Sequence, residues 1–252
     1  RKILPNEHII YLGDTARVPY GNKSPQTITK YALESAIFLL TKGIKILVVA
    51  CNTSSALALG VLQKKLPVPV LGVIEPGAKE AVRHSKNKKI GIIGTKATIS
   101  SMAYVNAMKR LDPDIEVFSK LCPLFVPIAE EGLENDKVAI FMAEKYLEEL
   151  KACGIDTLVL GCTHYPLLEW AIKTIMGDGI TIINTGIETA KEVQKTLDKK
   201  RILNDSGKRI SEYFVTDSPE TFKEIGNRFL GEEIKRIKFL KSLDFKDYLL
   251  SS

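Results

Sequence analysis

Short apolar runs alternate with longer helical segments along this chain, and that alternation limits the folds it can adopt. The runs are rich in β-branched residues, and each ends near Gly, Asn, Asp or Thr, as buried strands do. They lie at 9–12, 46–50, 70–74, 90–93, 157–160 and 180–183. Buried strands separated by helices favour an α/β fold with mainly parallel sheets.

The helices between these runs have recognisable ends. Ser24 followed by Pro25 is a typical N-cap with proline at the first helical position, and Gly43 is placed to end that helix. Three further helices are predicted: one beginning at Glu75-Pro76 without a good N-cap, one from about 136 to 153 ended by Gly154, and one between Ser218-Pro219 and Gly231.

A faint internal repeat suggests two domains. Residues 46–53 and 157–164 both read as a buried strand, a small residue, a cysteine and then hydrogen-bonding residues, with the cysteines 111 positions apart (162 minus 51). Any two buried strands look alike, but the matching cysteine favours a repeat. We therefore expect two similar α/β domains, 1–75 plus 185–252 and 76–184. Ligands bind at the carboxyl ends of parallel strands, so the active site is expected in the cleft between the domains.

Composition excludes several classes of protein. The chain has 252 residues, 45% of them hydrophobic, which is ordinary for a globular protein, and no apolar run long enough to span a membrane. The first residues do not form a secretory signal, so a cytoplasmic protein is expected. The net charge of +6 gathers at 86–89, 199–201 and 235–246. Aromatic residues are not interleaved there, which favours solvated surface over nucleic-acid binding.

Four cysteines need an explanation. They form no CxxC pair, and with three histidines no zinc-ligand spacing emerges. Cys122 precedes a proline and Cys153 lies at a predicted helix end, so both are assigned to structure. Cys51 and Cys162 instead follow buried strands and have polar flanks, where backbone N–H groups and a helix dipole lower the pKa of a thiol. One such cysteine alone is better explained by core packing, but two in matching positions indicate working thiols.

Two opposed thiols suit the inversion of an amino acid without a cofactor. One base removes the α-proton from one face, and the second group returns a proton to the other face, so thiolate and thiol exchange roles in every turnover. Neither thiol needs to act as a nucleophile. Developing charge on the α-carboxylate requires fixed donors, which Thr53, Thr163 and backbone N–H groups could supply.

Five segments carry a resemblance to the glutamate racemase family, in order across nearly the whole chain. Ala50-Cys51-Asn52-Thr53 and the run Gly-Cys-Thr-His-Tyr-Pro at 161–166 resemble the two cysteine motifs of that family. The other three segments are Gly-Asp-Thr-Ala-Arg-Val-Pro-Tyr-Gly at 13–21, Ile-Gly-Thr-Lys-Ala-Thr at 93–98 and Phe-Val-Thr-Asp-Ser-Pro at 214–219.

The resemblance implies a role for each matching residue. Cys51 and Cys162 would be the two acid/base groups, with His164 as the proton partner of the second thiol. The substrate-binding positions would be Tyr20, Gly21, Asn52, Thr53, Thr95, Thr98, Thr163 and Glu131. Structural alternatives stand beside several of these: a Pro-Tyr-Gly turn for Tyr20 and Gly21, capping of strand-to-helix turns for the Asn and Thr residues, and a solvated helix face for Glu131.

The activity implied is the interconversion of L- and D-glutamate, which supplies D-glutamate for bacterial peptidoglycan. No cofactor is implied: no metal, pyridoxal phosphate or nicotinamide. The run Gly91-Ile92-Ile93-Gly94 lacks the features of a phosphate loop. The expected partner is the small amino-acid substrate, with no nucleic acid and no membrane, and a homodimer is the assembly to test.

Two alternatives stay open. Aspartate or another small amino acid is the nearest rival substrate. The second is a ligand-binding module that lost catalysis. This alternative arises because the family begins with a strand ending in Asp-Ser-Gly, which contributes to the first half-site. That strand would lie ahead of Arg1. A smaller departure is Asn184-Thr185-Gly186, where family members often carry an acidic residue.

Overall fold

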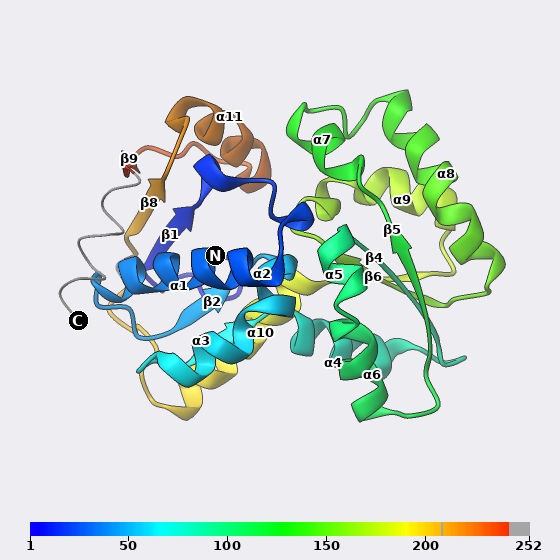
Figure 1. Cartoon of the computed structure of the whole chain (residues 1–252), viewed down its shortest axis with the longest axis horizontal. Helices are drawn as coiled ribbons and strands as arrows, with labels where there is room; N and C mark the ends of the chain where they lie inside the picture. Colours follow the sequence, from blue (N-terminus) through cyan, green and yellow to red (C-terminus); the bar gives the residue numbers. More distant parts are fainter. Residues whose placement is uncertain (208, 242–252) are drawn as a thin grey trace. The chain divides into compact units, whose positions relative to one another are not determined.

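A computed structural model describes residues 1–207 and 209–241 of the chain (Figure 1). The end of the basic stretch 235–246 lies outside these residues. The strands are β1 (Ile9–Gly13), β2 (Leu47–Val49), β3 (Val70–Gly72), β4 (Lys89–Gly94), β5 (Glu116–Leu121), β6 (Thr157–Gly161), β7 (Thr181–Asn184), β8 (Ser211–Val215) and β9 (Ile237–Phe239). The helices are α1 (Pro25–Leu40), α2 (Asn52–Leu57), α3 (Leu59–Lys65), α4 (Ile74–His84), α5 (Lys96–Ser100), α6 (Ala103–Leu111), α7 (Phe125–Glu130), α8 (Lys137–Ala152), α9 (Glu169–Met176), α10 (Thr185–Lys199) and α11 (Pro219–Leu230).

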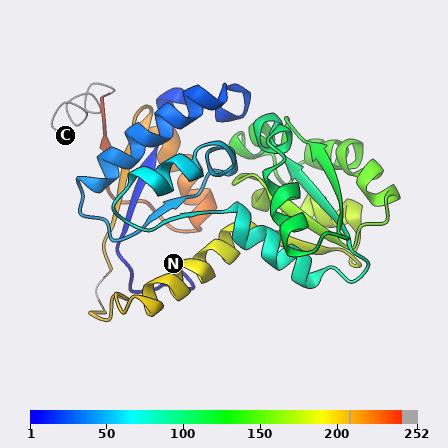
Figure 2. The ribbon, with the colours of Figure 1, turned by 60° about the horizontal axis from the view of Figure 1, so that its bottom comes forward.

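The chain forms two compact units. The first unit contains Arg1–Val48, Ala58–Leu71 and the described residues from Ala190 onward; the second contains Val49–Leu57 and Gly72–Thr189. The division falls inside α10, which Figure 2 shows as one continuous helix. The domains expected from sequence, 1–75 plus 185–252 and 76–184, divide the chain differently. Segment Val49–Leu57 groups with the second unit because α2 packs against α4 and α5.

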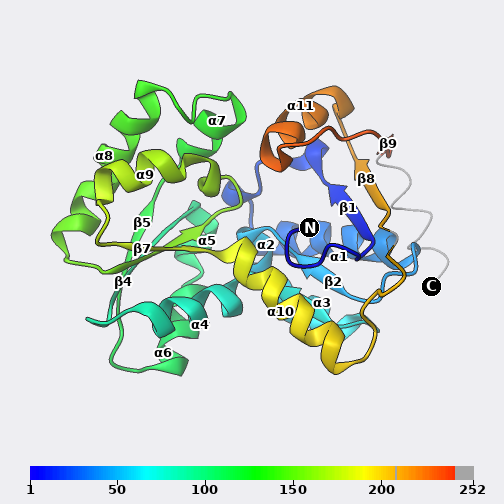
Figure 3. The same cartoon turned by 180° about the vertical axis from the view of Figure 1, so that it is seen from behind.

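The second unit is built on a parallel four-stranded sheet in the order β5-β4-β6-β7. Helices α7, α8 and α9 cover one face, and α4 and α6 cover the other (Figures 1 and 3). Along β6, Leu158 and Leu160 pack into the first of these layers, whereas Val159 packs into the second. A strand buried on both faces reads as a continuous apolar run, which is why the sequence predicts it so clearly.

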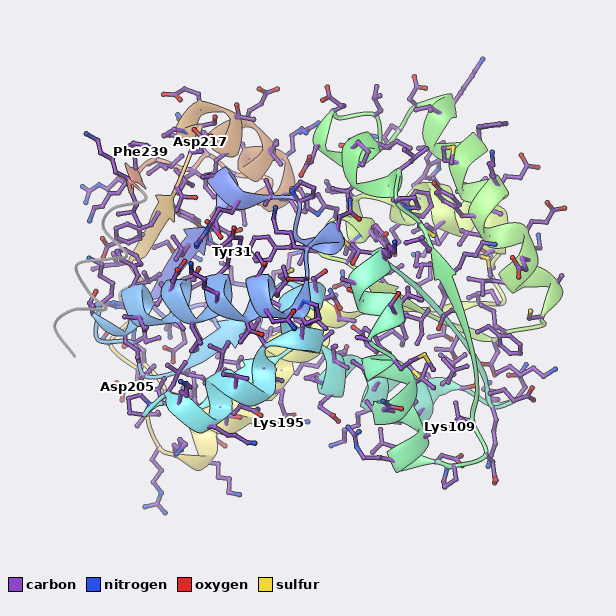
Figure 4. The ribbon with its side chains drawn as sticks, in the orientation of Figure 1. Tyr31, Lys109, Lys195, Asp205, Asp217 and Phe239 are labelled. Carbon is purple, nitrogen blue, oxygen red and sulfur yellow. The ribbon has the colours of Figure 1, made fainter. Side chains whose placement is uncertain are left out.

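The first unit contains a smaller parallel sheet in the order β1-β8-β9, with Ile9 paired with Ser211. Helix α1 packs along β1. Tyr31 on α1, labelled in Figure 4, lies under the guanidinium of Arg17, 4.0 Å from the ring centroid. This cation–π contact ties the segment after β1 to the helix.

The predicted α/β class with parallel sheets is confirmed. Each of the six predicted strands coincides with one in the structure, although the run at 70–74 ends as a strand at Gly72 because Ile74 begins α4. Strands β5, β8 and β9 were not predicted. β5 lies at the edge of its sheet, so its sequence Glu-Val-Phe-Ser-Lys-Leu lacks the continuous apolar character of a central strand.

The predicted helix ends agree with the structure, with one difference in detail. Ser24 caps α1 by accepting a hydrogen bond from the Thr27 amide at 3.3 Å, and Asp136 caps α8 through the Val138 amide at 2.8 Å. Gly43 adopts a positive φ of 69° after α1. Ser218 precedes α11 but does not cap it, because its hydroxyl faces Asp217 instead.

Across residues 1–207 and 209–241, no helix has both the length and the apolar character needed to cross a membrane.

Replacing Gly161 tests how tightly β6 packs against β4. A Cβ atom at Gly161 would lie 2.6 Å from the carbonyl oxygen of Ile93, a backbone atom that cannot move aside. Gly161→Ala should therefore lower the free energy of unfolding by about 1–3 kcal/mol, as overpacked cores do. The measurement is urea unfolding followed by circular dichroism. Gly179→Ala is the matched control, because no atom lies within 4 Å of its added Cβ; equal loss in both variants would contradict the close approach.

Candidate active site

Cys51 lies in the turn that joins β2 to α2, in the second unit, and its side chain is half-buried. Ser55, one turn further along α2, fixes this turn. Its hydroxyl donates to the Val49 carbonyl at 2.7 Å and accepts from the Val73 amide at 3.2 Å. One side chain thus holds the end of β2 against the start of α4, which sets the position of the thiol.

Three threonine hydroxyls gather beside this turn. Thr53 Oγ1 lies 3.0 Å from Thr95 Oγ1 and 3.4 Å from Thr98 Oγ1, and the latter two are 3.0 Å apart. Thr95 also caps α5 by accepting from the Thr98 amide at 3.4 Å. A hydroxyl can both donate and accept, so this cluster can turn a donor toward an anionic group of a ligand.

Asn52 begins α2 and is buried, with 3% of its surface exposed. Its Oδ1 accepts a hydrogen bond of 2.6 Å from the hydroxyl of Tyr104 on α6. Its Nδ2 is buried and has no hydrogen-bond partner among the described residues. Tyr104 was not predicted as a site residue, because at its helical spacing an aromatic residue is typical of the core.

Cys162 follows β6 and is buried. Its Sγ lies 3.8 Å from Nδ1 of His164, and Nε2 of the same ring lies 3.0 Å from Oε1 of Glu130. Burial raises the pKa of the Cys162 thiol to about 12, and charge on Cys51 and Glu130 adds to the rise. Hydrogen bonds from His164 and Thr163 oppose it. At neutral pH the Cys162 side chain is therefore a thiol in the ligand-free protein.

The His164 ring can act as a relay for the Cys162 proton. A carboxylate only accepts hydrogen bonds, so Nε2 donates its proton to Glu130, and Nδ1 of the neutral ring is an acceptor that faces both the thiol at 3.8 Å and the Thr163 hydroxyl at 3.3 Å. Transfer of the proton to Nδ1 would form a thiolate beside an imidazolium, with the Glu130 charge stabilising the cation. The arrangement can therefore store or release one proton at Sγ.

The structure distributes the predicted residues as follows. Cys51, Asn52, Thr53, Thr95, Thr98, Cys162, Thr163 and His164 all lie in the second unit. Tyr20 and Gly21 lie in the first unit, in a short helix (Tyr20–Asn22) where the Tyr20 hydroxyl donates to Asp14. Glu131 is exposed at the end of α7, and it is the preceding residue, Glu130, that contacts His164.

The remaining two cysteines have structural surroundings. Cys122 follows β5 in the apolar layer under α7 and α8, and burial raises its pKa well above the ordinary value. Cys153 ends α8. All four cysteines are free thiols. Within the described residues, no three His, Cys, Asp or Glu side chains gather in a way that could hold a metal ion.

The parallel α/β fold agrees with what comparison with known proteins shows. The family described as Asp/Glu/Hydantoin racemase matches residues 1–193. The chain belongs to this racemase family, and by that membership it is an enzyme of the isomerase class.

Particular relatives narrow the comparison. A glutamate racemase of Geobacter metallireducens is 50% identical over 234 residues, covering 92% of this chain and 87% of the relative. One from Aquifex aeolicus is 47% identical over 235 residues, covering 93% and 89%. The crystal structure of a glutamate racemase isoform from Bacillus anthracis is 41% identical, with a TM-score of 0.92 over 95% of this chain and 90% of that chain. A glutamate racemase from Francisella tularensis, solved in complex with D-glutamate, is 36% identical with a TM-score of 0.89, covering 95% and 90%.

The pKa of Cys162 can be tested through its alkylation. Only the thiolate reacts with iodoacetamide, so for a thiol with a pKa of about 12 the rate should still rise tenfold per pH unit above pH 9. Peptide mapping by mass spectrometry would follow the rate at Cys162 between about pH 7 and pH 11, with free cysteine, of pKa about 8.5, as the reference. Slow access scales the whole curve without changing its slope. A plateau for Cys162 at the same pH as free cysteine would contradict the raised pKa.

Proposed function

We propose that the protein interconverts L- and D-glutamate, with Cys51 and Cys162 as the two acid/base groups. The observation that carries the proposal is the Cys162 thiol beside the His164–Glu130 pair, in the same unit as Cys51. Membership of the racemase family and the names of the relatives support glutamate as the substrate. The product D-glutamate would supply peptidoglycan synthesis.

In one direction the Cys51 thiolate removes the α-proton from one face of the amino acid. The electron pair left on the α-carbon delocalises toward the α-carboxylate, where hydrogen-bond donors stabilise the developing charge. The Cys162 thiol then delivers its proton to the opposite face, which inverts the centre. The raised pKa of Cys162 supports its role as the acid in this direction, because the buried thiol holds its proton until the carbanion forms.

In the other direction Cys162 must start as the thiolate. Its burial opposes that state, so the proton needs an acceptor. His164 Nδ1, 3.8 Å from Sγ, is the acceptor that the geometry favours, and Glu130 at 3.0 Å from Nε2 stabilises the imidazolium. We assign His164 and Glu130 to this proton exchange and make no use of a cofactor.

Binding of glutamate requires partners for an ammonium group and two carboxylates. We assign Thr53, Thr95, Thr98 and Thr163 to substrate binding, with Asn52 as a buried amide beside the first thiol. The mutual hydrogen bonds of the Thr53 cluster support this, because each hydroxyl can exchange one for a bond to the ligand. Tyr20, Gly21 and Glu131 are retained as proposed binding residues.

Removing either thiol should separate exchange of the α-hydrogen with solvent from inversion of the α-carbon. In Cys51→Ser or Cys162→Ser the remaining thiol can still remove the α-proton of one enantiomer and return deuterium to the same face, but inversion should fall by about 10³-fold or more. The measurement is circular dichroism of D- and L-glutamate with the full-length protein in deuterated buffer, with NMR at the α-position. The two variants should favour opposite enantiomers for exchange.

Cys153→Ser is the control for this pair, since it changes a thiol at a helix end. It should racemise glutamate at the wild-type rate. Absence of both exchange and inversion in the wild-type protein would refute the proposed function, and inactivation by Cys153→Ser would refute the choice of thiols.

Two adjacent carboxylates allow a sharp test of the proton partner. Glu130→Gln removes the charge that stabilises the His164 imidazolium, so kcat should fall roughly tenfold, chiefly in the direction that starts from the Cys162 thiolate. Glu131→Gln, on the neighbouring exposed residue, should have a smaller effect on that direction. The measurement is the initial rate from each enantiomer, and a larger loss in Glu131→Gln than in Glu130→Gln would contradict the assignment of Glu130 to the proton exchange.

A further inference from the structure

The Asn52 carboxamide is held in one orientation by a residue that no motif includes. Tyr104 is 2% exposed, lies in the apolar layer between α4, α6 and the sheet, and donates its hydroxyl proton to Asn52 Oδ1 at 2.6 Å. Its ring rests against β6, since a Cβ atom at Gly161 would lie 3.5 Å from the ring. The tyrosine thus connects the residue after the first thiol with the strand that ends at the second.

Packing alone does not explain the hydroxyl of Tyr104. A phenylalanine would fill the same space among the apolar side chains, whereas a tyrosine must find a partner for its hydroxyl when buried. That hydroxyl donates to Asn52 Oδ1. Burial raises the pKa of Tyr104 well above its ordinary value, so the phenol keeps its proton and remains a donor.

The other end of the Asn52 carboxamide is left without a partner. Oδ1 is occupied by the Tyr104 proton, which directs Nδ2 and its two N–H groups away from Tyr104. Nδ2 is buried and has no hydrogen-bond partner among the described residues. A buried donor of this kind is costly unless a ligand supplies an acceptor.

We propose that Tyr104 is a positioning residue, whose hydroxyl fixes Asn52 so that the carboxamide N–H groups bind the α-carboxylate of the amino acid. This inference rests on the proposed function. An ammonium group has no lone pair and cannot accept from Nδ2, whereas a carboxylate accepts readily. Asn52 immediately follows Cys51, so a carboxylate held there lies next to the base. Without the Tyr104 proton, the carboxamide is free to turn its oxygen toward the ligand, which repels the carboxylate.

The test is a double-mutant cycle on Tyr104 and Asn52 in the full-length protein. Dissociation constants for D-glutamate are measured by calorimetry, and kcat and KM by circular dichroism, for wild type, Tyr104→Phe, Asn52→Ala and the double variant. Tyr104→Phe should weaken binding and raise KM roughly 3- to 10-fold, the size expected for one hydrogen bond. In the Asn52→Ala background the same change should have no further effect, since the tyrosine acts through the carboxamide.

Tyr165→Phe is the matched control. Tyr165 is also fully buried, and its hydroxyl donates to the backbone carbonyl of Cys122 at 2.8 Å. Loss of this hydrogen bond in Tyr165→Phe should lower the melting temperature as much as Tyr104→Phe does, while KM for glutamate stays within twofold of wild type. A merely structural role for Tyr104 would give the two variants the same kinetics.

The possible results separate this inference from the proposed function. The positioning role would be overturned if Tyr104→Phe left the affinity for D-glutamate unchanged. It would also be overturned if Tyr104→Phe lowered that affinity equally in the wild-type and Asn52→Ala backgrounds, even with racemisation intact. Binding of D-glutamate that depends on Tyr104 through Asn52, without turnover by the wild type, would support the positioning role and refute the racemase. A wild type that does not bind D-glutamate would overturn both.

Discussion

The close approach of β6 to β4 is the constraint on which the site depends. The two strands meet with the Gly161 Cα so near the Ile93 carbonyl that a side chain as small as a methyl group would collide with the backbone. Cys162 follows directly, so its depth in the molecule is set by this contact. The same glycine leaves room for the Tyr104 ring, through which the second strand end touches the first.

The two thiols are unequal because their local structures are unequal. Cys51 lies half-buried in a turn fixed by Ser55. Cys162 is buried, and its Sγ faces the ring of His164, which in turn contacts Glu130. Burial alone would keep the Cys162 proton in place. Hydrogen bonds from the His164 backbone and the Thr163 side chain oppose the effect of burial, so the thiolate of Cys162 is stabilised by neighbouring groups rather than by exposure to water.

Sequence reasoning reached the parallel α/β class and the positions of the central strands because those strands are buried on both faces. It missed β5, where an edge position weakens the apolar signal, and it missed Tyr104, whose spacing on α6 is that of a core residue. The sequence singled out Glu131 as a substrate-binding position and gave no signal for Glu130, because two adjacent carboxylates are indistinguishable until a helix end directs one of them toward His164. Which residues group with Cys51 depends on contacts distant in sequence, which no local pattern encodes.

The long sequence separations in this site have a consequence for its assembly during synthesis. Asn52 cannot bond to Tyr104 until 52 more residues have been synthesised, and Thr53 cannot bond to Thr95 until 42 more have been added. Cys162 follows Cys51 by 111 residues (162 minus 51), which at the usual pace of translation is roughly 5 to 20 seconds. Val73, Thr95 and Tyr104, the partners of Ser55, Thr53 and Asn52, are all made before Cys162, so the first half of the site can be fixed before the second thiol is synthesised.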